Sequence, residues 1–237
     1  MAERAARLVA PADPVVLARA RPRYVSRGGE KLAAALAHFG IEVTGRVALD
    51  VGASTGGFTD CLLQHGAAKV VALDVGRGQL HERLVADSRV RNLERTNLRG
   101  VPRTLLGEAP FALVVGDLSF ISLVAVAGEV VDLAQPDADV VLLVKPQFEA
   151  GRREVSKGRG VIRDRVVWAQ ALERVGTAIE SQGAAMMGAM VSPLRGADGN
   201  VEFLAHFRAH QPTPADPLVL RLAIDDLVAG VDAGTER

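Results

Sequence analysis

Short apolar runs alternate along the chain with longer stretches whose apolar residues recur at helical spacing. Four of the runs end in a polar or charged residue: 47–50, 70–74, 113–117 and 140–145. Runs that are apolar on both faces suit a parallel sheet covered by helices on each side. We therefore expect these segments to be strands of one sheet, with a short third strand just before residues 93–97.

Helices are expected over 58–65, 79–87, 123–133 and 164–181, and ahead of the first strand over 26–39. In this first helix Leu32, Leu36 and Phe39 lie on one apolar stripe, and Gly40 is a suitable C-terminal stop. The alternation of strands and helices indicates a doubly wound α/β fold, in which ligands bind beyond the carboxyl ends of the strands.

The last third of the chain has a different pattern. Residues 185–192 and 201–207 are expected strands, and the segment 193–200 between them is rich in Pro, Gly, Asp and Asn. Such a loop favours a turn, so the two strands are expected to pair as an antiparallel hairpin. By analogy of fold, a parallel sheet with a terminal hairpin is more typical of AdoMet methyltransferases than of dinucleotide-dependent dehydrogenases.

Charge is balanced over the 237 residues but unevenly placed. Residues 1–31 hold seven Lys or Arg against three acids, 145–165 hold seven against three, and the tail after Gln211 holds five acids and two Arg. Each run can be a solvated surface. The single cysteine, Cys61, excludes an intramolecular disulfide and falls on an apolar helix face, which predicts a buried structural thiol.

No apolar stretch reaches the length of a membrane span, and the N-terminal segment lacks the apolar core of a signal peptide. We therefore expect a cytoplasmic protein. The five histidines show no metal-ligand grouping, so no metal is expected.

The segment DVGASTGGF, residues 50–58, joins an expected strand to an expected helix. Its glycines let the backbone turn tightly and approach a ligand, and free N–H groups at the helix start favour an anion. Asp74 ends the next strand, where a carboxylate can accept hydrogen bonds from ribose hydroxyls. Residues 93–97 are a candidate adenine-side loop. These features indicate a nucleoside cofactor and fit NAD as well as AdoMet.

Four charged residues carry the candidate chemistry: Lys31, Asp117, Lys145 and Glu202. Lys145 emerges from a run of five apolar residues and precedes Pro146. An ion pair with a neighbouring carboxylate explains any one such lysine as readily as a function does. That explanation is much weaker for all four residues together.

Five strings in this order make a family resemblance specific: VSRGGEK at 25–31, DVGASTGGF at 50–58, DLSFIS at 117–122, VKPQFE at 144–149 and GNVE at 199–202. With them the chain resembles the haemolysin A (TlyA) group of rRNA 2′-O-methyltransferases, within the FtsJ-like (RrmJ-type) methyltransferase superfamily. The likeness runs from about Tyr24 to about Phe207.

The resemblance implies a Rossmann-like class I AdoMet methyltransferase, α/β, with a mostly parallel seven-stranded sheet, a terminal antiparallel hairpin and helices on both faces. It implies S-adenosylmethionine as methyl donor, ribosomal RNA or ribosomal subunits as partner, and a cytidine ribose as the target. The Lys-Asp-Lys-Glu tetrad of the family maps onto the four residues above. The cofactor would be held by Asp50, Gly52, Ala53, Ser54, Gly56, Gly57, Phe58, Asp74, Asn97 and Asp117.

In that tetrad we expect Lys145 to be the general base. A ribose hydroxyl is a poor nucleophile until its proton begins to leave, so the catalyst must align the reacting atoms and accept that proton. A lysine base works in its neutral form, which burial and a second ammonium nearby favour. Lys31 and Glu202 would orient Lys145 and the hydroxyl, and Asp117 would hold Lys145 close to the methionine amine.

Typical members of the family begin with a small RNA-binding module, and only about two dozen residues precede Tyr24. We therefore expect a remnant of that module at 1–25, the methyltransferase domain at 26–210, and an acidic tail or helix at 211–237. The basic stretch 145–165 is expected to be a mobile loop that contacts phosphates and covers the target nucleotide.

Other functions stay open at this point. They are a methyltransferase acting on another RNA or on a small hydroxylated molecule, a membrane-active haemolysin, a non-catalytic AdoMet-binding RNA protein, and a nicotinamide oxidoreductase. No basic amphipathic helix of membrane type supports the haemolysin, and the intact tetrad disfavours the non-catalytic protein. The modified nucleotide and the oligomeric state stay open as well.

Overall fold

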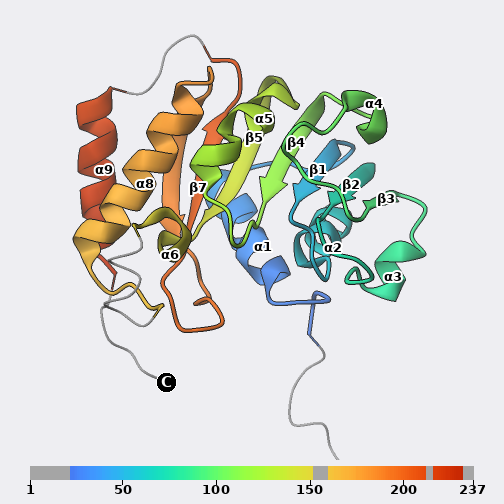
Figure 1. The fold of residues 1–237 in the computed structure, drawn as a ribbon, viewed down its shortest axis with the longest axis horizontal. Helices are drawn as coiled ribbons and strands as arrows, with labels where there is room; N and C mark the ends of the chain where they lie inside the picture. The colour runs from blue at the N-terminus through green and yellow to red at the C-terminus, as the bar shows by residue number, and fades with distance from the viewer. Residues whose placement is uncertain (1–21, 152–159, 212–215, 232–237) are drawn as a thin grey trace, which may run out of the picture.

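A computed structural model describes residues 22–151, 160–211 and 216–231, and it has the expected alternation of strands and helices (Figure 1). The sequence also allows a short strand at 15–18; this segment and residues 152–159 of the expected basic loop lie outside the described residues. The sheet has seven strands in the order β3-β2-β1-β4-β5-β7-β6. The first five are parallel, and β7 is antiparallel to both of its neighbours, β5 and β6. The mostly parallel sheet with a terminal hairpin is therefore confirmed.

Most strands begin and end within two residues of their expected positions. Their bounds are β1 (Val47–Val51), β2 (Lys69–Leu73), β3 (Val90–Leu93), β4 (Phe111–Gly116), β5 (Ala134–Val144), β6 (Ala185–Val191) and β7 (Phe203–Arg208). The exception is β5, which begins six residues before the apolar run at 140–145. After the buried Ala134, residues 135–137 are exposed, and a register shift in β4 between Phe111 and Leu113 separates this start from the buried half. Hydrophobic periodicity does not detect such a strand start.

The helices agree less evenly with the expectations. Their bounds are α1 (Gly28–Phe39), α2 (Gly57–Gln64), α3 (Glu82–Val85), α4 (Arg103–Leu106), the 3₁₀ helix η1 (Leu123–Val126), α5 (Ala127–Asp132), α6 (Pro146–Glu149), α8 (Arg165–Glu180) and α9 (Pro217–Ala229). Helix α1 ends at Gly40 with φ 65°, as expected. The helix predicted over 79–87 is wrong in length, because the His81 side chain accepts the Arg83 N–H and starts a single turn there. The helix predicted over 123–133 is η1 followed by α5.

Helices cover both faces of the sheet (Figure 1). One apolar layer lies on each face. Neighbouring strand residues point to opposite layers: Ala48 packs toward α1 and α2, whereas Leu49 packs in the layer that contains α5, α8 and α9. Cys61 lies in the first layer with no exposed surface, so the predicted buried thiol is confirmed. Helix α9 packs against α8 and the edge strand β6.

A buried carboxylate lies at the middle of β5, away from the carboxyl ends of the parallel strands. Asp139 is 1% exposed, and its oxygens contact Arg46 Nη1 at 2.6 Å, His206 Nε2 at 2.8 Å and Arg208 Nη2 at 3.2 Å. Burial would raise the pKa of Asp139, but the hydrogen bonds from His206 and Arg46 and the charge of Arg208 hold it below its ordinary value. This cluster joins strands β5 and β7 to the loop before β1.

Candidate active site

The four charged residues of the expected tetrad lie at one edge of the sheet and form two ion pairs. Lys145 follows β5 and Asp117 follows the adjacent β4, and Lys145 Nζ lies 2.5 Å from Asp117 Oδ1. Lys31 is in the first turn of α1, and its Nζ lies 2.5 Å from Oε2 of Glu202, the residue just before β7. The side chains of Lys31 and Glu202 are 9% and 3% exposed, so this second pair is almost fully withdrawn from solvent.

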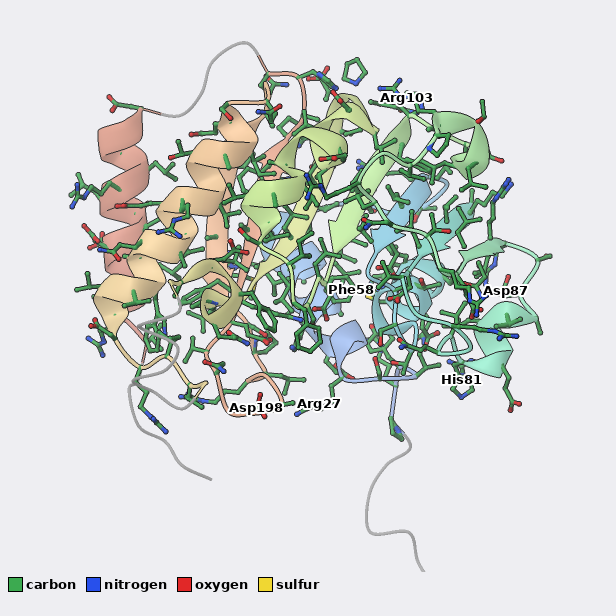
Figure 2. All side chains as sticks on the ribbon, in the orientation of Figure 1. Arg27, Phe58, His81, Asp87, Arg103 and Asp198 are labelled. Carbon is green, nitrogen blue, oxygen red and sulfur yellow. The ribbon has the colours of Figure 1, made fainter. Side chains whose placement is uncertain are left out.

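The register of the sheet brings the two pairs next to each other. Strands β5 and β7 are antiparallel, and their last paired residues at this end are Val144 and Phe203. Lys145 and Glu202 are the next residues beyond that pair, so they extend from neighbouring strands at the same position. Arg27 precedes α1 and so marks the end of that helix that carries Lys31. In Figure 2 it lies at the lower edge of the view, opposite Arg103.

The strings at 117–122 and 144–149 interlock around Lys145. The Lys145 ammonium donates to Ser119 Oγ at 2.8 Å, beside its contact with Asp117. At the other end of the turn, the buried carboxylate of Glu149 accepts hydrogen bonds from Ser122 Oγ at 2.5 Å and from Leu123 N at 2.8 Å. Burial raises the pKa of Glu149. The two strings therefore form one structural unit that fixes the direction of Lys145.

Phe120 is held at the apex of this turn in an unfavourable backbone conformation. Its φ is 65°, and its side chain is 94% exposed. A non-glycine residue in the left-handed region costs on the order of 1 kcal/mol, and such strain concentrates at functional sites. The ring lies 5.4 Å from that of Phe148, over which Lys145 Nζ sits at 5.8 Å. Sequence reasoning assigned Phe120 no role, because neither its exposure nor its strain shows in the pattern of residues.

A small pocket beside Asp117 is formed by the glycine loop (residues 50–58) and the start of α1. Its lining residues are Ser26, Gly28, Gly52, Ala53, Ser54, Thr55, Gly57, Phe58 and Asp117. The loop fits tightly: a Cβ on Gly57 would lie 2.3 Å from Ser26 Oγ and 2.9 Å from Gly29 N. The start of α2 therefore touches the start of α1, which carries Lys31.

The remaining expected cofactor residues, Asp50, Gly56, Asp74 and Asn97, do not line this pocket. Asp50 is fully buried, and its Oδ2 accepts a hydrogen bond from Thr59 Oγ1 at 2.6 Å while Oδ1 has no partner. Burial raises the pKa of Asp50 to about 7, although the Thr59 hydrogen bond lowers it. Asp74 accepts backbone N–H groups of Ser54 and Gly76 at 2.8 and 2.7 Å, which joins it to the glycine loop.

Gly56 packs against a neighbouring element, and Asn97 lies apart from the pocket. A Cβ on Gly56 would lie 2.2 Å from Leu84 Cδ1, so this glycine lets α3 pack against the loop. The exposed Asn97 side chain accepts the Arg99 N–H at 3.0 Å, and Asn97 does not line the pocket.

The residues present suit AdoMet at this pocket. The methionine part of AdoMet carries an ammonium and a carboxylate, and the pocket offers the Asp117 carboxylate for the first and N–H groups at the start of α2 for the second. The buried Oδ1 of Asp50, which has no partner, lies beneath the same loop. Asp74 does not line the pocket but accepts the Ser54 N–H of the glycine loop, and its carboxylate can also accept hydrogen bonds from ribose hydroxyls.

Substituting Gly52 by alanine is expected to weaken AdoMet binding by about tenfold. Gly52 has φ 82°, and a Cβ there would lie 2.7 Å from the Asp117 carbonyl oxygen, so the loop must shift away from Asp117. Titration calorimetry with AdoMet measures the effect. Gly45→Ala is the matched control, because Gly45 has φ 75° but nothing within 4 Å. Equal AdoMet affinity in the two variants would contradict the tight fit inferred at Gly52.

Two negative findings apply to residues 22–151, 160–211 and 216–231. No group of three or more His, Cys, Asp or Glu side chains in these ranges could hold a metal ion. No helix in the same ranges is long and apolar enough to cross a membrane.

Known proteins are similar to this chain in both sequence and fold. The 16S/23S rRNA (cytidine-2′-O)-methyltransferase TlyA of Mycobacterium tuberculosis is 47% identical over 205 residues, which covers 86% of this chain and 74% of the relative. Hemolysin A of Brachyspira hyodysenteriae is 45% identical over 185 residues, covering 78% and 77%. A solved structure from Streptococcus thermophilus, described as a proposed hemolysin, has a TM-score of 0.83 at 40% identity, covering 89% and 74%.

The family model described as FtsJ-like methyltransferase matches residues 24–209. This range contains the glycine loop and all four residues of the two ion pairs, and it spans most of the 237 residues. A nicotinamide oxidoreductase is thereby excluded. The chain belongs to the FtsJ-like methyltransferase family.

Proposed function

We propose that this protein transfers the methyl group of AdoMet to the ribose 2′-hydroxyl of a cytidine in ribosomal RNA, with Lys145 as the general base. The observation that carries the proposal is the position of Lys145, which contacts Asp117 and Ser119 next to the pocket beneath the glycine loop. The Mycobacterium tuberculosis relative is named for this reaction. Because the proposed substrate is ribosomal RNA, we expect the protein to act in the cytoplasm.

AdoMet supplies a methyl group already activated by its sulfonium, so the remaining work is alignment and proton removal. Asp117 and the start of α2 would hold the methionine part, and Asp74 would hold the ribose. In its neutral form, after giving one proton to solvent, Lys145 would accept the proton of the 2′-hydroxyl on Nζ as the oxygen bonds to the methyl carbon and the carbon–sulfur bond of AdoMet breaks. Asp117 and Ser119 then stabilise the ammonium that forms, since both already contact Nζ.

The second ion pair supports this role of Lys145 from the neighbouring strand. Glu202 is tied to Lys31, and the register places it beside Lys145. In this arrangement the Glu202 carboxylate would hold the Lys31 ammonium near the position of the hydroxyl. A hydroxyl that donates to Lys145 can accept from Lys31, which would orient it for attack.

Phe120 provides a stacking surface for the base of the target nucleotide. Recognition of an unpaired base commonly uses an aromatic side chain, and each stacked base contributes about 1–3 kcal/mol. Phe120→Ala is therefore expected to raise KM for RNA about tenfold and to leave AdoMet affinity unchanged. Leu222→Ala, at another exposed apolar residue, is the matched control. Unchanged KM in both variants would remove Phe120 from the RNA site.

The proposed function is tested with AdoMet that carries a tritiated methyl group. Purified ribosomal subunits, intact ribosomes and naked rRNA are offered as acceptors, and labelled RNA is digested to nucleosides and analysed by mass spectrometry. Labelled 2′-O-methylcytidine is the expected product. Label on a base, on another nucleoside or on another RNA would contradict the proposed target, and unlabelled RNA despite AdoMet binding would exclude a ribosomal acceptor.

A further inference from the structure

The side chain of Asn200 joins two segments that meet beside the active site. Asn200 is 1% exposed and lies two residues before Glu202. Its Oδ1 accepts the Ile162 N–H at 2.9 Å, and its Nδ2 donates to the Gly160 carbonyl at 2.9 Å. The amide thus pairs with a carbonyl and an N–H two residues apart, as a neighbouring strand would. It satisfies two backbone groups that belong to no helix or strand.

The segment that Asn200 holds is fixed from its other side as well. The Ile162 carbonyl accepts a hydrogen bond from Trp168 Nε1 at 3.1 Å, and both side chains are buried. The Trp168 ring in turn contacts Phe203, the residue that follows Glu202, with ring centroids 6.1 Å apart. Asn200 and Trp168 therefore clamp residue 162 between the start of β7 and the start of α8.

On its own segment, Asn200 shapes the turn that covers Glu202. The Asn200 carbonyl accepts the Gly196 N–H at 2.9 Å, and the Glu202 carbonyl accepts the Ser192 N–H at 2.8 Å. A Cβ on Gly196 would lie 2.6 Å from Glu202 Oε1. The turn at 193–200 is therefore folded directly onto one carboxylate oxygen, while the other oxygen pairs with Lys31.

We propose that Asn200 is a positioning residue for methyl transfer, which fixes the Glu202 carboxylate between Lys31 and Gly196 by tying its strand to residues 160–162. This inference rests on the proposed function, since it assigns Asn200 a role through Glu202. The AdoMet pocket is built from other elements, the glycine loop, α1 and Asp117. Substitution of Asn200 should therefore slow the chemical step and leave AdoMet binding unchanged.

Two substitutions of Asn200 separate its two hydrogen bonds. Asn200→Ala removes both, whereas Asn200→Asp keeps the shape and the acceptor for Ile162 N and, when ionised, loses the donor to the Gly160 carbonyl. We expect both to lower kcat about tenfold or more, since small misplacements of catalytic groups have effects of this size. The dissociation constant for AdoMet should stay within twofold of the wild-type value. Asp139→Asn is the control, because it removes a buried carboxylate from a cluster that lies away from the tetrad.

The decisive measurement is single-turnover transfer in Asn200→Ala, in Glu202→Gln and in the double variant, with wild-type protein in the same assay. If Asn200 acts through Glu202, the double variant transfers methyl as fast as Glu202→Gln alone. A further full loss in the double variant overturns the proposal. A kcat loss in Asn200→Asp that is no greater than in Asp139→Asn, at equal loss of thermal stability, overturns it as well. Failure of the proposed function itself would show separately, as wild-type protein that labels no RNA.

Discussion

Replacing Lys145 with alanine should lower kcat for methyl transfer by about a thousandfold, the contribution typical of a positioned general base. Lys145 Nζ contacts Asp117 and Ser119. The other lysine of the tetrad, Lys31, forms an ion pair with Glu202 at 2.5 Å. AdoMet affinity should stay within a few fold, because Lys145 does not line the pocket under the glycine loop. Single-turnover transfer and titration calorimetry measure the two quantities.

Lys145→Arg distinguishes a base from a fixed positive charge. Arginine keeps the charge next to Asp117 but does not deprotonate in proteins, so this variant should be as inactive as the alanine variant. Lys69→Ala is the matched control, since Lys69 pairs with Glu108 at an exposed site at the start of β2. If Lys145→Arg kept a tenth of the wild-type rate or more, charge and not proton transfer would be the role of Lys145.

Replacing Asp139 with asparagine should lower the free energy of unfolding by roughly 3 kcal/mol at neutral pH, the lower end of the effect of breaking a buried ion pair. Asparagine keeps the shape but leaves Arg46, Arg208 and His206 without their shared carboxylate. The two arginine side chains are about a third exposed, at 29% and 34%, which is why the lower end applies. Urea unfolding followed by circular dichroism measures the loss.

The same comparison has a defined pH dependence. The folded pKa of Asp139 lies below its ordinary value, so its contribution is fully present above the unfolded pKa of about 4 and is lost as pH falls through the folded pKa. The gap between wild type and Asp139→Asn should therefore narrow below about pH 4. Glu108→Gln, at the exposed pair with Lys69, should show no measurable change. A gap that persists undiminished in acid would show that Asp139 acts by packing and not by charge.

Strands and helices in which buried residues recur at a regular spacing were predictable from the sequence. The strand ends at Asp50, Asp117 and Lys145 were located within a residue or two, because an apolar run stops where the chain leaves the sheet. Helix α1 and its stop at Gly40 followed from one apolar stripe and one glycine. Helix α6 was missed because it is a single turn, and its start signal is Pro146 at the first helical position.

The partners of the site residues were predictable only in part. The tetrad came from a resemblance, and its pairing as Lys145 with Asp117 and Lys31 with Glu202 depends on strand order. Glu149 and Asn200 belong to the strings that carry the resemblance, yet their partners lie 26 to 40 residues away. No local sequence pattern indicates such contacts, because the role of a buried polar side chain becomes clear only once its hydrogen-bond partner is known.

The place of β7 in the sheet has a consequence for synthesis of the protein. Strand β7 is made after β6, yet it lies between β5 and β6, and Lys31 meets Glu202 across 171 positions of sequence. In a chain still growing on the ribosome, Lys31 therefore lacks its carboxylate until Glu202 has emerged, and β5 is an unpaired edge until β7 is complete at Arg208. Fragments that end before β7 leave that edge of β5 unpaired and the hairpin incomplete, so we expect them to transfer no methyl group.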